Sequence, residues 1–319
     1  MKVTVVGAGG NVGSTVALSV AQRDFAKEVI ALDLERKQDD KTFYPSKGRA
    51  LDQWEASPIH LFDTRVKGST DYADTAGSDV CVITAGVPRR PGMSRDDLLE
   101  INANIVRSVT TELVKYSSDT ILIIVSNPLD VMVQVAKDAS GLPYEKVMGM
   151  AGILDTARYR AFIADELDVS PKDIQALLMG GHGDTMVPLP RFTTLSGMPI
   201  THFITEERLD EIVDRAKKGG GEIVGLMGTS AWYAPGAAAA QMVEAILLDQ
   251  NRIFPVCAHI DGEYGIDDLY IGVPVKLGKG GIKEVIGVEL TKKENELLQE
   301  SAKAVRGTLD DFKALMNNK

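Results

Sequence analysis

Cysteine and histidine are scarce in this sequence. Among 319 residues there are two cysteines, Cys81 and Cys257, and four histidines. No CxxC or HExxH pattern occurs, which argues against a structural zinc site, and we expect no bound metal. Both cysteines lie in apolar segments, which indicates buried thiols in a reducing compartment rather than a disulfide.

Long apolar segments and an excess of basic residues are also missing. No apolar run is long enough to span a bilayer, and the chain passes from Met1 into a strand-like segment without a leader peptide. Acidic residues outnumber basic ones by 45 to 35, for a net charge of −10, whereas nucleic-acid-binding proteins favour a basic face. We therefore expect a cytoplasmic protein whose partners include neither membranes nor nucleic acids.

The first half of the chain alternates short apolar runs with helical stretches. Val and Ile dominate the runs, with little alternation of apolar and polar residues, as in parallel strands buried on both faces. Helices are expected over Asn11–Arg23 and Ser94–Tyr116, between strands. Strand, helix and strand in repetition predict a doubly wound α/β parallel sheet. The expected strands are Lys2–Val6, Glu28–Leu32, Val80–Ala85, Ile121–Val125 and Lys146–Met150.

The second half has a different organisation, in which long helices precede strands. This order is typical of an α+β domain, so we predict one domain over residues 1–150 and a second over 151–319. The polar run Glu35–Lys47 is expected to be a flexible insert. The expected elements of the second half are helices at Ile153–Leu167, Glu206–Leu226, Pro235–Leu248 and Lys292–Met316, and strands at Ala258–Gly262, Tyr270–Leu277 and Gly281–Val288.

A glycine-rich turn joins the first strand to the first helix. It reads Gly7-Ala8-Gly9-Gly10-Asn11-Val12-Gly13. Either Gly7 and Gly9 begin the dinucleotide fingerprint G-x-G-x-x-G and Gly13 is one residue late, or Gly10 and Gly13 complete it and Ala8 replaces the first glycine. Such a turn also occurs without a ligand. If a dinucleotide binds here, the backbone of the turn and the helix N-terminus would hold its pyrophosphate.

An acidic residue supports the interpretation as a cofactor site. Asp33 ends the second strand twenty residues after Gly13, where a carboxylate binds the ribose hydroxyls of NAD and repels the 2′-phosphate of NADP. Arg36 and Lys37 follow closely and soften that preference. We therefore predict a dinucleotide-binding domain that takes NAD.

Four side chains supply what NAD-dependent oxidation of an alcohol requires. His182 lies between glycines in Gly180–Asp184, so its ring is accessible and can take the hydroxyl proton. Asp155 would orient the ring, and Arg158, three residues later on one helix face, would clamp a substrate carboxylate. Arg95 would polarise a carbonyl oxygen. The plainer alternatives are a structural histidine and an exposed helical ion pair.

Residues 88–95, Pro-Arg-Arg-Pro-Gly-Met-Ser-Arg, form a basic turn in an acidic protein. The prolines and Gly92 cannot continue a helix, so this is a shaped loop after a buried strand. Three guanidinium groups within eight residues indicate an anion site, although a solvated surface turn explains them as well.

Together these residues resemble the malate and lactate dehydrogenase superfamily, specifically its lactate-dehydrogenase-like malate dehydrogenases. The similarity covers nearly the whole chain. It implies a Rossmann NAD-binding domain followed by an α+β catalytic domain, interconversion of (S)-malate and oxaloacetate in the tricarboxylic acid cycle, and a homo-oligomer, a tetramer rather than a dimer. The motifs that carry it are Gly7–Gly13, Asp33, Pro88–Arg95, Asn102, Val125–Pro128, Leu154–Arg158, Gly180–Asp184 and Tyr233–Gly236.

The resemblance also implies a role for each matched residue. His182 would accept the proton and Asp155 would orient it. Arg158 would bind the C1 carboxylate, Arg95 would close over the substrate, and Arg89 would hold the distal carboxylate of a dicarboxylate. Asn127 would contact both the substrate and the nicotinamide ribose. Further contacts to NAD are implied for Asn102, Val125 and Ser126.

Two other functions remain open. A lactate or other 2-hydroxyacid dehydrogenase has the same fold, but a lactate methyl group would leave the Arg89 guanidinium unpaired at a cost of several kcal/mol in order of magnitude. A non-catalytic NAD-binding protein also has this fold, but it does not need the full set of catalytic side chains.

The sequence departs from the family pattern in two places. The glycine loop has an extra residue, and the segment from Asp33 to Gly48 is several residues longer; both should affect cofactor binding more than the chemistry. The helices Arg49–Ser57 and Glu206–Leu226 carry more apolar residues than one chain would bury, as expected for an oligomer.

Overall fold

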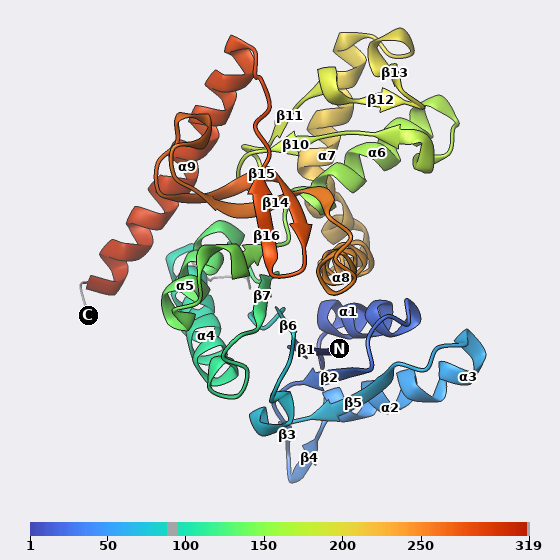
Figure 1. The fold of residues 1–319 in the computed structure, drawn as a ribbon, viewed down its shortest axis with the longest axis vertical. Coiled ribbons are helices and arrows are strands. Elements are labelled where there is room, and N and C mark those ends of the chain that lie inside the picture. The colour runs from blue at the N-terminus through green and yellow to red at the C-terminus, as the bar shows by residue number, and fades with distance from the viewer. Residues whose placement is uncertain (88–94, 318–319) are drawn as a thin grey trace.

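The computed structural model describes residues 1–87 and 95–317, and within these residues the chain builds a nine-stranded sheet (Figure 1). Six of its strands are parallel and lie side by side in the order β5-β2-β1-β6-β7-β8, the doubly wound order with its switch point between β1 and β6. These strands are β1 (Lys2–Val6), β2 (Glu28–Leu32), β5 (Arg65–Ser69), β6 (Val80–Ile83), β7 (Ile121–Ile124) and β8 (Val147–Gly149).

The predicted parallel strands are confirmed, and one strand was missed. β6, β7 and β8 are one or two residues shorter than predicted at their ends. β5 was not predicted because Arg65 and Lys67 are charged and only Val66 and Ser69 are buried along this edge strand. Edge strands with charged side chains lack the continuous apolar run that reveals central strands.

The second half extends the same sheet. β14 (Arg252–Ile260), β15 (Leu269–Gly278) and β16 (Gly281–Val285) pair antiparallel, and β14 joins β8 where Cys257 lies opposite Gly149. β14 begins six residues before the predicted Ala258. Its start was missed because Arg252 and Ile253 are exposed and because Pro255 is an unusual residue within a strand. The remaining strands of this half form small sheets: β10 (Leu178–Met179) with β11 (Val187–Pro188), and β9 (Ile174–Gln175) with β12 (Thr194–Leu195) and β13 (Met198–Pro199).

Helices cover both faces of the sheet (Figure 1). On one face α1 (Asn11–Gln22) packs against α8 (Tyr233–Leu247) and α2 (Pro45–Glu55), which continues into α3 (Ser57–His60). On the other face α4 (Arg95–Tyr116), α5 (Leu129–Ser140) and α9 (Lys292–Asn317) contact one another. α5 was not predicted, because its run of buried Leu, Val and Met residues resembles a buried strand. α6 (Gly152–Leu167) and α7 (Glu206–Met227) pack together beside the small sheets and complete the second core.

The expectation that Glu35–Lys47 is a flexible insert was wrong. The segment forms a hairpin of β3 (Arg36–Gln38) and β4 (Lys41–Phe43) and leads into α2 at Pro45. Asp39 makes the turn in the left-handed region, with a φ of 52°. All six strand residues are exposed, so no alternation of apolar and polar residues marks the hairpin in the sequence.

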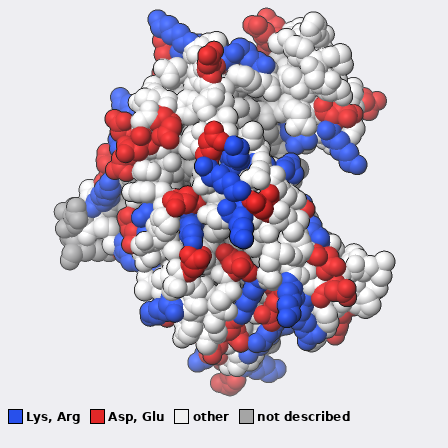
Figure 2. All heavy atoms as spheres, viewed as in Figure 1, with Lys and Arg blue, Asp and Glu red and all other residues white. Residues whose placement is uncertain are grey.

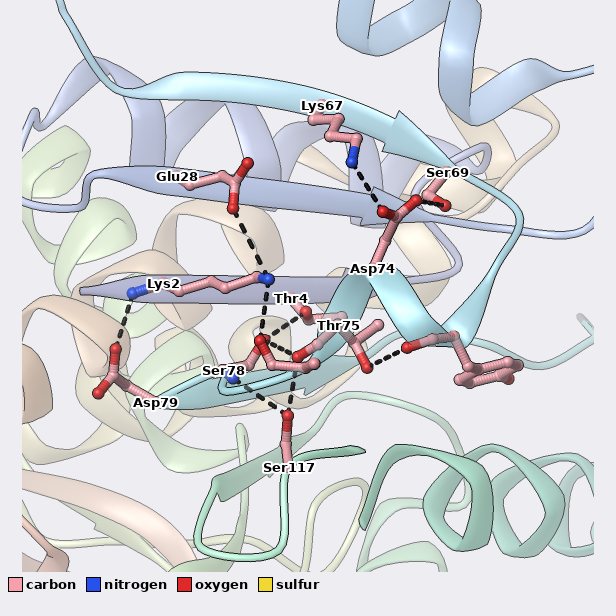
Figure 3. Close-up of polar contacts among 12 residues, drawn as sticks. Lys2, Thr4, Glu28, Lys67, Ser69, Asp74, Thr75, Ser78, Asp79 and Ser117 are labelled. Carbon is pink, nitrogen blue, oxygen red and sulfur yellow. Dashed lines mark hydrogen bonds and ion pairs between the residues drawn. The ribbon is translucent and has the colours of Figure 1, made fainter. Parts of the chain in front are cut away.

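Buried hydroxyl groups connect the amino-terminal ends of β1 and β6 (Figure 3). Thr4 Oγ1 and Ser78 Oγ lie 2.7 Å apart, and the Ser78 backbone N–H donates to Ser117 Oγ at 3.0 Å. Ser117 Oγ in turn donates to the Thr75 carbonyl at 2.8 Å. Because the polar groups here are satisfied locally, this end of the sheet is closed, and the carboxyl ends of the strands are left for a ligand.

Charged side chains of both signs share the surface. On the face seen in Figure 2, Lys and Arg are interspersed with Asp and Glu. Across the described parts of the chain, no helix has the length and apolar character needed to cross a membrane.

Gly272 of β15 tests a close backbone contact within the second half of the chain. It exchanges two backbone hydrogen bonds with Gly180, of 2.8 and 3.1 Å, and an added Cβ would lie 2.3 Å from the Gly180 carbonyl oxygen. We expect Gly272→Ala to lower the free energy of unfolding by about 1–3 kcal/mol, because the backbone must shift to make room. Urea unfolding would measure this. Gly287→Ala, where an added Cβ meets open space, is the matched control, and equal stabilities of the two variants would contradict the prediction.

Candidate active site

A cavity of about 910 Å³ opens at the carboxyl ends of β1, β2 and β6. This is the switch point of the parallel sheet, where doubly wound proteins bind their ligands. The predicted cofactor residues Gly7, Gly9, Gly10 and Asp33 line it, together with Leu34, Ala85, Gly86 and Ile105.

At three of its positions the glycine loop has no room for a side chain. Gly7 has a φ of +84°, and an added Cβ would lie 2.7 Å from Thr84 Oγ1. At Gly13 it would lie 2.5 Å from the Gly7 carbonyl oxygen, and at Gly9 2.7 Å from Asp33 Oδ2. Gly10 is less constrained, with its nearest contact at 3.2 Å. The geometry therefore favours the alignment in which Gly7, Gly9 and Gly13 are the fingerprint glycines and the loop holds one extra residue.

Asp33 ties the loop to the second strand. Its Oδ2 accepts a hydrogen bond of 2.7 Å from the Gly9 backbone N–H, and its Oδ1 accepts one of 2.7 Å from the Leu34 N–H. Arg36 and Lys37 line the same cavity, and Lys37 pairs with Glu35 at 3.5 Å. No described side chain caps the N-terminus of α1. The uncapped amide groups and the glycine cradle fit the pyrophosphate of NAD.

A second cavity, of about 370 Å³, holds the predicted catalytic residues. Val12 and Val125 line it from the sheet side. Asp155, Arg158 and His182 face them from the second half of the chain. The remaining lining includes Asn127, Met150, Met186, Lys217 and the α7 glycines Gly220 and Gly221.

Asp155 is the centre of this cavity's polar groups. Its carboxylate is buried in the first turn of α6; Oδ2 lies 2.8 Å from His182 Nδ1 and Oδ1 lies 3.4 Å from Arg158 Nη1. The three-residue spacing on α6 places Arg158 on the same side as Asp155. A carboxylate at Nδ1 keeps a proton on that nitrogen and leaves Nε2 as the atom that can accept another.

The charges around His182 favour its protonated form. Burial by itself lowers the pKa of the imidazole, and Arg158 lowers it further. The charge and hydrogen bond of Asp155, with the charge of Asp130, outweigh both and raise the pKa above its ordinary value of 6.5. The surroundings of the ring therefore stabilise the proton that it would accept.

Three different elements hold the loop that carries His182. Gly180 pairs with Gly272 of β15. The Gly181 N–H donates to Ser301 Oγ of α9 at 2.9 Å, and the His182 N–H donates to Asp130 Oδ2 of α5 at 3.2 Å. The loop is thus fixed by the sheet and by two helices, which positions the ring without help from a ligand.

Several predicted cofactor residues support loops. The Asn102 amide is buried; its Nδ2 donates to the Asn127 carbonyl at 2.7 Å and its Oδ1 accepts from the Val87 N–H at 2.8 Å. Ser126 Oγ donates to the Ala85 carbonyl at 2.6 Å. Asn11 Oδ1 accepts from Arg49 at 2.9 Å. Asn102 and Ser126 thereby hold the backbone of Asn127 and Ala85, which line the cavities.

The basic turn cannot be placed in this site. Arg89 lies outside the described residues. Arg95 is the first residue of α4, and its backbone alone is described. Three further residues at this site were not predicted from the sequence: Asp130, Ser301 and Lys217. Of these, only Asp130 had a signal, as the one acidic residue at the start of an apolar run three positions after Asn127.

Comparison with known proteins agrees with this architecture. A family model described as the lactate/malate dehydrogenase NAD-binding domain matches residues 1–149, and one described as the alpha/beta C-terminal domain of the same family matches residues 153–316. Over 315 residues the chain is 61% identical to a malate dehydrogenase of Salinibacter ruber, covering 99% of this chain and 98% of that protein. Over 311 residues it is 57% identical to a malate dehydrogenase of Cytophaga hutchinsonii, covering 97% of each.

Solved structures give the same result. The malate dehydrogenase from Salinibacter ruber has a TM-score of 0.93 at 58% identity, and the match covers 100% of this chain and 99% of that one. A lactate dehydrogenase from Cryptosporidium parvum, solved with lactic acid and nicotinamide adenine dinucleotide, has a TM-score of 0.90 at 37% identity, covering 98% of each chain. The chain belongs to the lactate/malate dehydrogenase family of NAD-dependent oxidoreductases.

Proposed function

We propose that this protein catalyses the reversible NAD-dependent interconversion of (S)-malate and oxaloacetate. The observation that carries the proposal is the array in the second cavity, where the buried Asp155 carboxylate lies between the His182 ring and the Arg158 guanidinium. The relatives named malate dehydrogenase, at 61% and 57% identity, support the dicarboxylate.

The chemistry divides between the two cavities. Bound NAD supplies the hydride acceptor, and Gly7, Gly9, Gly13 and Asp33 hold it. As the substrate C2–H leaves as hydride, His182 Nε2 takes the hydroxyl proton, so the substrate loses two electrons and two hydrogens in all. Asp155 stabilises the resulting imidazolium from the far side of the ring.

Arginines bind and select the substrate. Arg158 holds the C1 carboxylate through paired hydrogen bonds, and Asn127 contacts the reacting end. Arg95 closes over the carbonyl and polarises it, and Arg89 pairs with the distal carboxylate. The lactate dehydrogenase alternative lacks a partner for Arg89, because pyruvate ends in a methyl group.

The proposal also covers the assembly and the location of the protein. Exposed apolar side chains on α2, α3 and α7, with the residue that follows α3, support a homo-oligomer, and the preference for a tetramer over a dimer comes from the family resemblance alone. They are Leu51, Ile59, Leu61, Val224 and Leu226. The buried free thiols of Cys81 and Cys257 support a cytoplasmic location.

Steady-state kinetics test the activity directly. We expect NADH oxidation to be fast with oxaloacetate and slow with pyruvate, and NADPH to be a poor substitute. His182→Asn should abolish turnover while NADH fluorescence still reports binding, because the variant loses the proton acceptor and keeps the cofactor cavity. Cofactor binding without turnover in the wild type would identify a binding protein, and a preference for pyruvate would identify a lactate dehydrogenase.

The pH dependence tests the role of Asp155. Malate oxidation needs neutral His182, so its kcat/KM should rise as the pH rises through the raised pKa, and oxaloacetate reduction should fall over the same range. Asp155→Asn removes the principal cause that raises this pKa. Both limbs should move to lower pH, and kcat should fall by about 100-fold or more. Unmoved limbs would contradict the assignment.

Arg89 tests substrate selection. Arg89→Gln removes the charge proposed to hold the distal carboxylate, so kcat/KM for oxaloacetate should fall by about 100-fold while the slow pyruvate reaction changes little. Parallel measurements with both acids give the ratio. Equal losses with the two substrates would refute a selective role.

A further inference from the structure

We propose that Asp130 is a second active-site carboxylate, which positions His182 through its backbone and stabilises the protonated ring by its negative charge. The inference rests on the proposed function, since it concerns the proton that His182 exchanges with the substrate. Asp130 is a positioning residue, because its hydrogen bond is with the His182 backbone and not with a ring nitrogen.

The contacts place the Asp130 carboxyl against the catalytic loop. Asp130 lies in the first turn of α5, and its Oδ2 accepts the His182 N–H at 3.2 Å. An added Cβ at Gly181 would lie 3.4 Å from the same oxygen. The carboxyl therefore lies beside the backbone of two consecutive loop residues.

The same residue couples this loop to the other side of the site. Asp130 follows Asn127 by three residues, and Asn127 lines the cavity that contains His182. α5 thus begins next to one lining residue and holds the backbone of another. A shift of the helix would change the distance between the two groups that are proposed to face the substrate.

A structural role by itself does not require a carboxylate. An amide oxygen accepts a backbone N–H equally well. Asp130 Oδ1 is buried, and the side chain beside the carboxyl is the Cys257 thiol, a weak hydrogen-bond donor. A carboxylate compensated so weakly destabilises a fold. A negative charge at this point is costly to the fold, which indicates that the charge itself has a use.

The charged groups around the ring show what that use is. Asp155 and Arg158 of α6 face His182, Asp130 approaches from α5, and Lys217 of α7 lines the same cavity. Cys257 of β14 lies beside Asp130, and burial raises the pKa of its thiol well above the ordinary value, so it stays neutral. The negative charges of Asp155 and Asp130 thus balance the positive charges of Arg158 and Lys217. Asp130 adds to Asp155 in stabilising the imidazolium.

The charge of Asp130 has opposing influences. Burial, together with the charge of Asp155, raises the pKa of this carboxyl above its ordinary value, and the Cys257 thiol, the His182 charge and the His182 N–H offset only part of that rise. Formation of the imidazolium during malate oxidation therefore stabilises the Asp130 anion, and the anion stabilises the imidazolium. This reciprocity is expected for two groups whose titrations are linked.

The test separates charge from hydrogen bonding. Asp130→Asn keeps an acceptor for the His182 N–H and removes the charge, whereas Ser301→Ala removes the hydrogen bond to Gly181 without changing any charge. NMR titration of the imidazoles reads the effect without turnover. The sequence has only four histidines, His60, His182, His202 and His259, so a spectrum of His182→Asn assigns the signal.

We expect Asp130→Asn to lower the His182 titration midpoint by about half a pH unit or more, because one of two stabilising charges is lost. The acidic limb of kcat/KM for malate should move by the same amount. In Ser301→Ala the midpoint should stay in place even if the rate falls. If Asp130→Asn folds poorly, Asp130→Ser also removes the charge, and the same shift of the His182 midpoint is expected.

An unchanged midpoint in the charge-removing variants would overturn the proposal and leave Asp130 as a structural acceptor. An equal shift in Ser301→Ala would overturn it as well, since loop loosening would then explain the change. The titration needs neither NAD nor substrate. If the protein were inactive on malate, the proposed function would be refuted, and the His182 midpoint would still test the role of Asp130.

Discussion

The 2.8 Å contact between Asp155 and His182 is the interaction on which the second half of the structure depends. A carboxylate buried to this degree destabilises a fold unless it is paired. Its partners come from two places: Arg158 lies one turn along the same helix, and His182 lies on a loop held by β15, α5 and α9. The helix, the loop and the sheet must therefore all form before the carboxylate is satisfied, which makes the site a product of the whole fold.

The sheet explains why the two cavities lie next to each other. The switch point between β1 and β6 opens the cofactor cavity at the carboxyl ends of the strands. β14 then continues the sheet beyond β8, so the second half is built onto the edge of the first. Val12 at the start of α1 and Val125 after β7 line the second cavity opposite His182. In the proposed reaction, this arrangement would put the hydride acceptor on one side of the substrate and the proton acceptor on the other.

Sequence patterns revealed the elements whose surroundings are uniform. Central strands are apolar throughout, so β1 and β2 were predicted to the residue, and Gly7, Gly9, Gly10 and Asp33 of the predicted cofactor site line one cavity. The hairpin of β3 and β4 and the edge strand β5 were missed because exposed strands have no apolar signature. α5 was missed for the opposite reason, since its apolar run resembles a strand. Asp130 is on that helix, and its relation to His182, 52 residues away, has no local signal.

The sequence by itself determined which side chains are available for the proposed chemistry: a glycine loop and Asp33 for a dinucleotide, and His182, Asp155 and Arg158 for a hydroxy acid. These residues are informative because each needs a particular side chain in a short motif. Only the tertiary structure decided which glycines have no room for a Cβ, that Asn102 and Ser126 support loops, and that Asp130 lies behind the histidine. Such facts depend on distances between segments remote in the chain, and spacing along the sequence does not encode them.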